Sequence, residues 1–224
     1  MEARQRAQDA QDGRQVDDDG NTRGPGGGAC QRPFGVPEAR AQDNFTDPDS
    51  RIMKTGDGFQ QCYNAQAAVD EGSQLIVATA LTNGAADNGQ LLPLVEAVQD
   101  NTGARPAVTL ADSGYASEAT FVALEAQGLT AVVALGREGK ASRALDPARY
   151  PATQRMAERL ATAEGQAHYR RRKVIPEPVF GWIKEILGFR RFSVRGLTAV
   201  TGEWHLVCLA QNLKRLHRLG WAPA

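Results

Sequence analysis

The chain has 224 residues, of which 42% are hydrophobic and 23% are charged, and its 26 basic residues balance its 26 acidic ones. This composition is typical of a folded domain of ordinary size and excludes a chain that is disordered throughout. No apolar stretch approaches the ~20 residues that a membrane-spanning helix needs, and Met1 to Arg6 do not resemble a secretory signal. The sequence therefore predicts a soluble cytoplasmic protein with no membrane partner.

Residues 1–43 are rich in Gln, Asp, Arg and Gly, with a glycine-rich run at residues 24–28. Their apolar residues are too few to offset the entropy lost on ordering. This segment is predicted to be disordered or a poorly ordered linker. Residues 47–50, Asp-Pro-Asp-Ser, then indicate a turn or a helix cap.

The next elements are two strands and a helix. Residues 60–69 and 74–81 are predicted strands, and residues 70–73 have the composition of a hairpin turn between them. Leucine and valine at helical spacing then predict an amphipathic helix over residues 88–99.

A strand–helix–strand unit follows. Residues 107–111 are a short continuous apolar run, typical of a strand that is buried on both faces, and residues 130–135 are a second one. Between them, residues 117–127 are a predicted helix that Ser117 caps and that ends before Gly128. This alternation predicts an α/β fold with parallel central strands.

The last third of the chain is predicted to be basic and helical. Residues 137–167 break the pattern and are interpreted as an insertion with a helical stretch near residues 153–163, and further helices are predicted over residues 176–187 and 203–219. From His168 to Arg218 there are eleven Lys and Arg against three Glu, a net charge of +8. Such asymmetry indicates a nucleic-acid surface, and a solvated helix face is the alternative.

The three cysteines do not indicate a metal or disulfide framework. Cys30, Cys62 and Cys208 are far apart and form no CxxC pair. This spacing excludes a zinc ribbon and does not favour a set of disulfides.

Two acidic residues stand where a catalytic site could form. Asp112 follows the predicted strand 107–111 directly, and ligands of open α/β sheets collect at the carboxyl ends of strands. Glu177 lies in the first turn of a predicted helix, with Lys184 two turns further along the same face. Helix capping by Asp112 and the helix dipole at Glu177 explain both residues equally well without a catalytic role.

Several strings occur in a fixed order along the chain. They are residues 44–54, 63–70 and 110–115, the set Tyr169, Arg172, Glu177 and Lys184, and then residues 189–192, 195–196, 203–204 and 210–213. In number and order these strings resemble those of bacterial insertion-sequence transposases, which have an RNase H-like core with a catalytic triad of acidic residues. The likeness runs from about Asn44 to Leu216.

The resemblance implies an α/β fold in which an RNase H-like mixed sheet is flanked by helices. The core would span residues 44–219, with an insertion at about 137–168 and a tail at 220–224. Asp112 would be the second catalytic aspartate and Glu177 the catalytic glutamate, both holding Mg²⁺ or Mn²⁺, and Asp87 would be a supporting acid. Two such ions activate the nucleophile and stabilise the leaving oxygen in phosphodiester chemistry.

The resemblance also implies partners. Double-stranded DNA of transposon ends and target would be bound, a homodimer on the DNA is allowed, and the protein would be associated with the bacterial nucleoid. The implied DNA contacts are Tyr169, Arg171, Arg172, Lys173, Lys184, Arg190 and Arg191. Arg171 is an alternative to Arg172, because the spacing from Arg172 to Glu177 differs by one residue from the family pattern.

The chain departs from the family pattern at one point. The first catalytic aspartate lies on the first core strand in the family, and no string here matches it; Asp47, Asp49 and Asp70 are not at the expected position. We therefore expect a truncated and catalytically impaired transposase whose sheet has a gap between the strands at residues 60–69 and 108–111. The alternatives are a remnant that binds DNA or a transposase subunit without catalysis, a nuclease with a re-formed site using Asp49 or Asp70, and an α/β protein with no DNA role.

Overall fold

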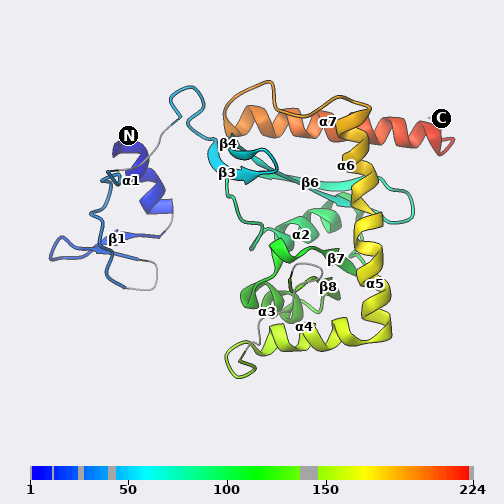
Figure 1. Ribbon diagram of the computed structural model, residues 1–224, viewed down its shortest axis with the longest axis horizontal. Helices are drawn as coiled ribbons and strands as arrows, with labels where there is room; N and C mark the ends of the chain where they lie inside the picture. Colours follow the sequence, from blue (N-terminus) through cyan, green and yellow to red (C-terminus); the bar gives the residue numbers. More distant parts are fainter. Residues whose placement is uncertain (1, 12, 25–27, 40–43, 137–145, 222–224) are drawn as a thin grey trace. The chain divides into compact units, whose positions relative to one another are not determined.

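The computed structural model describes residues 2–11, 13–24, 28–39, 44–136 and 146–221, and the chain forms two compact units, Met1–Pro48 and Asp49–Ala224 (Figure 1). None of the described helices combines the length and the apolar character of a membrane span. Residues 137–145 of the predicted insertion and 222–224 of the predicted tail lie outside the described residues.

The first unit contains the helix α1 (Glu2–Gln11) and a short antiparallel hairpin of β1 (Gln15–Val16) and β2 (Thr22–Arg23). Asp9 is fully buried in it. Its carboxylate accepts hydrogen bonds from Gln5 Nε2 at 2.9 Å and from the backbone N–H of Gly35 at 2.8 Å, and it forms an ion pair with Arg32.

These bonds change the ionisation of Asp9. The hydrogen bond from Arg32 is the largest cause and lowers the pKa of Asp9 to about 2. The sequence indicated disorder or poor order for residues 1–43 because apolar residues are scarce there. The structure has a helix and a hairpin in this segment, and polar bonds to one buried carboxylate hold them in place of an apolar core.

Two antiparallel hairpins open the second unit. β3 (Arg51–Thr55) pairs with β4 (Gly58–Cys62), and β5 (Asn64–Val69) pairs with β6 (Ile76–Thr82). The predicted strand at residues 60–69 is thus two strands, because its first part pairs backward with β3 and its second part pairs forward with β6.

The hairpin turn predicted at residues 70–73 is confirmed. The Asp70 carboxylate accepts hydrogen bonds from the N–H of Ser73 at 2.7 Å and from Ser73 Oγ at 2.6 Å. Gln74 then has a φ of 57°, a left-handed conformation that completes the reversal of the chain.

The strand–helix–strand unit is also confirmed. β7 (Thr109–Ala111) pairs in parallel with β8 (Ala131–Val133), and α3 (Glu118–Ala126) connects them. Ser117 Oγ accepts the N–H of Thr120 at 3.1 Å, which is the expected helix cap. The helix predicted at residues 88–99 is α2 (Leu91–Thr102), three residues later.

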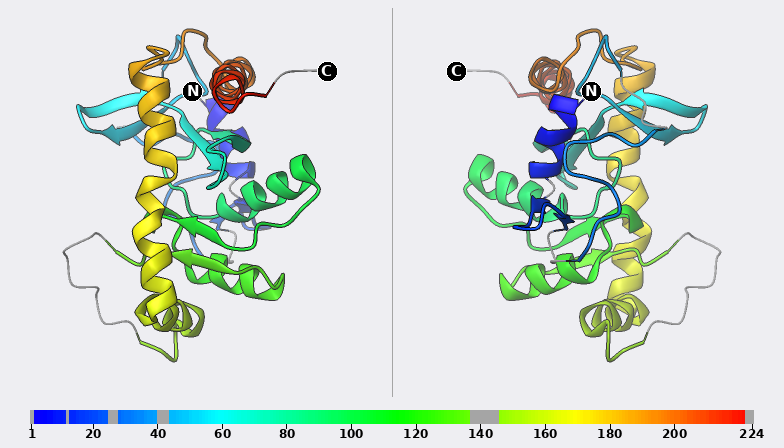
Figure 2. Two further views of the ribbon diagram at one scale, coloured as in Figure 1. Left: turned by 90° about the vertical axis from the view of Figure 1, so that its right-hand side faces the viewer. Right: turned by 90° about the vertical axis from the view of Figure 1, so that its left-hand side faces the viewer.

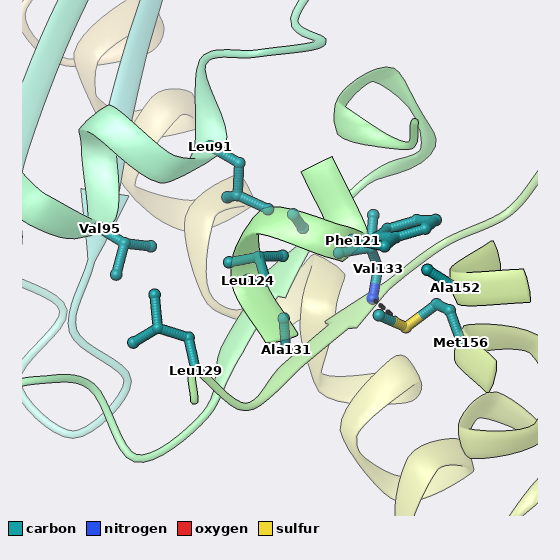
Figure 3. Close-up of a cluster of buried hydrophobic side chains, with 10 residues drawn as sticks. Leu91, Val95, Phe121, Leu124, Leu129, Ala131, Val133, Ala152 and Met156 are labelled. Atoms are coloured by element: carbon teal, nitrogen blue, oxygen red, sulfur yellow. Dashed lines mark hydrogen bonds between the residues drawn. The ribbon is translucent and has the colours of Figure 1, made fainter. Parts of the chain in front are cut away.

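Part of the predicted insertion is helical and packs into the core. α4 (Pro151–Ala161) places Ala152 and Met156 in the cluster shown in Figure 3, where they meet side chains of α2, α3 and β8. The Glu118 carboxylate accepts the N–H groups of Ala152 at 2.7 Å and Thr153 at 2.8 Å. A side chain 34 residues away in the sequence therefore caps this helix.

The helices α5 (Ala163–Val174) and α6 (Pro176–Glu185) follow one another as an almost continuous column beside the strands (Figures 1 and 2). The last helix, α7 (Leu197–Arg218), starts six residues earlier than predicted. Its first N–H, that of Leu197, donates to Asp49 Oδ2 at 2.8 Å, so an acidic side chain from far along the sequence caps this helix.

The described strands form four separate two-stranded sheets. The mixed α/β class is confirmed, but a single continuous sheet of the RNase H kind is not present among these strands. β5 pairs only with β6 and β7 only with β8, so each has one edge without a strand partner in the described part of the chain. This arrangement is in keeping with the expected gap between them.

Candidate active site

A cavity of about 1070 Å³ lies between the strands β5 and β7. Its wall includes every residue from Asn64 to Glu71 and every residue from Ala104 to Asp112, together with side chains of α2, α5 and α6. The candidate acids Asp87, Asp112 and Glu177 all line it.

Asp112 stands at the end of β7, where the chain turns into a short 3-10 helix at Ser113–Tyr115. Its Oδ1 accepts the N–H of Gly114 at 2.9 Å, so the capping role expected from the sequence is present. The carboxylate remains exposed, which leaves its other oxygen available to a ligand in the cavity.

Asp87 lies in the loop before α2, and its carboxylate, like that of Asp112, is close to Gly114. Its Oδ1 accepts Asn64 Nδ2 at 2.6 Å and Gln66 Nε2 at 3.0 Å, which fixes the carboxylate against β5. A Cβ atom on Gly114 would overlap Asp87 Oδ2 and stand 3.1 Å from Asp112 Oδ1. The two carboxylates therefore take up the space that a side chain at residue 114 would need, so only glycine fits at this position.

Asp87 and Asp112 both act electrostatically on the phenol group of Tyr115. The pKa of Tyr115 is raised, first by burial and then by the negative charges of Asp87 and Asp112. A phenol in this position stays neutral near neutral pH and can donate a hydrogen bond but not supply a charge.

Glu177 lies in the first turn of α6, between Pro176 and Pro178. Its side chain is exposed and has no hydrogen-bond or ion-pair partner among the described residues. Asp112 and Glu177 both lie in the wall of the cavity.

The described residues do not complete a metal site. No group of three or more His, Cys, Asp or Glu side chains among them lies close enough together to hold a metal ion. The carboxylates of Asp87 and Asp112 both lie close to Gly114, while Glu177 of α6 lines the same cavity. The donor set for a divalent ion is thus partial in the described part of the chain, and the Mg²⁺ or Mn²⁺ expected from the resemblance lacks a full set of ligands here.

The expected DNA-contacting cations fall into two groups. Arg172 and Lys184 line the cavity with Glu177. Arg172 Nε is buried without a hydrogen-bond partner in the described residues, and its guanidinium lies 5.0 Å from the ring centre of Tyr169. Arg172 and Lys184 therefore bring two positive charges to the wall of the cavity.

The other cations differ in their surroundings. Arg171 forms an ion pair with Glu71, and Arg190 Nη2 lies 2.7 Å from Glu185 Oε1. Arg191 is exposed, and the side chain of Lys173 lies outside the described part of the structure. Arg171 is therefore not equivalent to Arg172, since its charge is already balanced and it does not line the cavity.

No motif in the local sequence marks Asn64 and Gln66 as site residues. They lie at alternate positions of β5, so their side chains share one face of the strand and can hold one carboxylate between them. The alternate spacing of these two amides is the only local sign of such a site. Their partner Asp87 is more than twenty residues away in the sequence, so the pairing itself cannot be predicted from it. His168 also lines the cavity.

Residues 31–213 match the model of one protein family, described as the transposase DDE domain. No curated protein and no solved structure matches the chain. The matched region contains Asp87, Asp112 and Glu177 together with every expected DNA contact, and it covers most of the sequence. This chain therefore belongs to the family of transposase DDE domains.

Proposed function

We propose that the chain acts in DNA transposition, that it binds double-stranded DNA of transposon ends and target at the rim of the cavity, and that it is catalytically impaired by itself. The observation that carries this proposal is the convergence of Asp112, Glu177 and two cations on one cavity. Family membership supplies the reaction class, which is cleavage and transfer of DNA strands.

In this proposal Asp112 and Glu177 are the metal-binding acids. A divalent ion bound there would activate the attacking oxygen and stabilise the leaving one. Asp87 has a supporting role, because Asn64 and Gln66 occupy its Oδ1 and leave only Oδ2 directed toward Gly114. The impairment follows from the partial set of carboxylates among the described residues.

Arg172 and Lys184 are the proposed DNA contacts at the rim. Arg172 lines the cavity, and the N–H groups of a guanidinium are well suited to bind phosphate oxygens. Lys184 adds a second positive charge further along the column of α5 and α6. Tyr169 supports Arg172 by lying against its guanidinium.

A remnant that binds DNA or a transposase subunit without cutting is the second candidate function. The partial metal site favours it, because the cations at the rim do not depend on a metal ion. A site re-formed with Asp49 or Asp70 is not favoured. Asp49 Oδ2 caps α7 through Leu197, and Asp70 Oδ2 is held by Ser73 within its turn.

Binding to a short fluorescent DNA duplex of mixed sequence, measured over a series of salt concentrations, tests the proposal. The magnitude of the slope of log affinity against log salt should fall by about 0.9 for each phosphate that a variant no longer neutralises. Arg172→Ala and Lys184→Ala should each weaken binding and reduce the slope. Arg155→Ala is the control, because it removes one positive charge from a surface ion pair with Glu125 on α3. Equal weakening in the control and the rim variants would show that the rim is not the DNA surface.

Cleavage is tested separately on supercoiled plasmid with Mn²⁺. We expect no nicking above background from the chain alone. Nicking that persists in Asp49→Asn or Asp70→Asn and disappears in Asp112→Asn would contradict the impairment and show that the acids of the rim suffice. Loss of nicking in Asp49→Asn or Asp70→Asn would instead support a re-formed site.

A further inference from the structure

A second pocket, of about 190 Å³, lies where α6 packs against α7 (Figure 1). Val179 and Trp182 of α6 line it, whereas Glu177 and Lys184 of the same helix line the cavity between β5 and β7. The two spaces have no lining residue in common and lie on different faces of α6. The second space is called the α6–α7 pocket below.

Three cations of α7 line the α6–α7 pocket, namely Lys214, Arg215 and Arg218. None of them forms an ion pair with a carboxylate in the described part of the chain, and the pocket wall contains no Asp or Glu. Lys214 and Arg218 are one helical turn apart, where like charges repel each other. The helix dipole favours cations near the end of α7, but it does not require them to share one pocket.

Contacts with two other residues position these cations. Lys214 Nζ lies 4.1 Å from the ring centre of Trp182, and Arg218 Cζ lies 5.3 Å from the same centre. Arg215 Nε donates to the C=O of Ser73 at 2.6 Å, which uses one of the five N–H donors of its guanidinium. The pocket is therefore a fixed arrangement of positive groups around one ring.

A buried amide adds a neutral polar group to the pocket wall. Gln211 lines the pocket and is 5% exposed, and its Oε1 has no hydrogen-bond partner among the described residues. The last bond of a Gln side chain rotates between two broad wells, so this amide can present either an acceptor or an N–H donor to a ligand.

We propose that the α6–α7 pocket binds one phosphate group. Sites for whole small molecules have volumes of about 300–1,000 Å³, so a pocket of about 190 Å³ suits a single group of this kind. Phosphate oxygens accept charge-assisted hydrogen bonds from Lys and Arg, and the guanidinium fork matches their geometry. A carboxylate carries one negative charge, whereas a free or terminal phosphate carries nearly two and balances the three cations better.

This inference goes beyond the proposed function and does not rest on it, because free phosphate can enter the pocket without DNA or metal. The phosphate group could be inorganic phosphate or part of a DNA backbone. Both sources offer the same oxygens to the cations, and separate measurements distinguish them.

Thermal unfolding of the whole chain tests binding of inorganic phosphate, with ionic strength held constant by NaCl. A ligand that binds the native state raises the melting temperature in a saturable manner, whereas a general salting-out effect grows steadily with concentration. Acetate at the same ionic strength is the control for the phosphate group and should stabilise the chain much less.

Two matched variants assign the site. Arg218→Gln should weaken phosphate binding by about tenfold or more, as expected for the loss of hydrogen bonds to a charged group. Arg218 is exposed, so the variant should fold like the parent chain. Lys54→Gln removes an exposed positive charge from β3, outside the pocket, and should leave the affinity unchanged.

Tryptophan fluorescence gives a local measurement. Phosphate that draws Lys214 or Arg218 away from the Trp182 ring should change the emission of that ring. The change should disappear in Trp182→Phe and remain in Trp221→Phe, since Trp221 does not line the pocket.

DNA binding identifies the source of the phosphate group. A backbone phosphate in the pocket predicts that Arg218→Gln reduces the magnitude of the salt slope for duplex binding by about 0.9. An unchanged slope, together with the expected binding of inorganic phosphate, would identify free phosphate as the ligand.

Three outcomes would overturn the proposal. They are stabilisation that does not saturate or that acetate reproduces, equal phosphate affinity in Arg218→Gln and the parent chain, and a fluorescence change that persists in Trp182→Phe. Arg172→Ala, which alters the cavity between β5 and β7, should leave phosphate binding unchanged. Failure of the α6–α7 pocket is therefore distinguishable from failure of the rim as a DNA surface.

Discussion

Replacing Gly114 by alanine should destabilise the fold, because the two carboxylates at this point leave no room for a methyl group. The added Cβ would overlap Asp87 Oδ2 and press on Asp112 Oδ1 at 3.1 Å. Asp87 has little freedom to withdraw, since Asn64 and Gln66 hold its other oxygen. Overpacking of this kind costs about 1–3 kcal/mol in unfolding free energy.

Urea denaturation followed by circular dichroism measures this cost. The control is Gly202→Ala, because Gly202 lies within α7 with open space around it, and alanine there should stabilise the protein by about 0.5–1 kcal/mol. Gly114→Ala should lower the unfolding free energy and Gly202→Ala should raise it. This difference in sign distinguishes the effect of a steric overlap from the general effect of replacing glycine by alanine.

The same substitution in an Asp87→Ala variant shows whether contact with Asp87 causes the loss of stability. In Asp87→Ala the overlapping oxygen is absent, so adding Gly114→Ala should cost much less than it does in the parent chain. The coupling between the two changes should be about 1 kcal/mol or more, as expected for side chains in direct contact. An unchanged stability of Gly114→Ala, or an equal cost in both backgrounds, would refute the shared volume on which the site's geometry rests.

Three further predictions concern other parts of the chain. Glu118→Ala should lower the unfolding free energy by about 1–2 kcal/mol, because it removes the cap on Ala152 and Thr153 of α4; urea denaturation would contradict this if the stability did not change. Because the pKa of Asp9 is lowered to about 2, its ionised form stabilises the first unit at neutral pH by about 2 kcal/mol, and this contribution should be lost as pH falls from about 4 to 2. Amide exchange of α1 measures that loss, and Asp9→Asn should show no such pH dependence. Burial raises the pKa of Cys208 to about 12, so a thiol reagent should modify it at neutral pH only after unfolding; rapid reaction in the native protein would show that the residue is accessible.

Local signals in the sequence predicted the elements near the site well. Ser117 and Gly128 bracket α3 through capping and chain reversal, which depend on neighbouring residues only. The continuous apolar runs predicted the parallel pair of β7 and β8, since burial on both faces leaves no alternation. Asp112 was found for the same reason, because it follows such a run directly.

The interactions that sequence analysis missed join distant residues. Gln66 and Asn64 hold Asp87 from more than twenty positions away, and Asp49 caps α7 across most of the chain. The helix α1 and the hairpin of β1 and β2 are not predictable from local pattern either, since they depend on bonds to Asp9 and not on apolar periodicity. Pairing of this kind depends on the folded topology, which no local pattern specifies.

The fold tolerates the gap between β5 and β7 because each strand pair has an apolar core of its own. One cluster joins α2, α3 and α4 to β7 and β8, and the other joins α6 and α7 to β5 and β6. Neither cluster needs hydrogen bonds across the gap, so each pair can remain packed while one edge stays open.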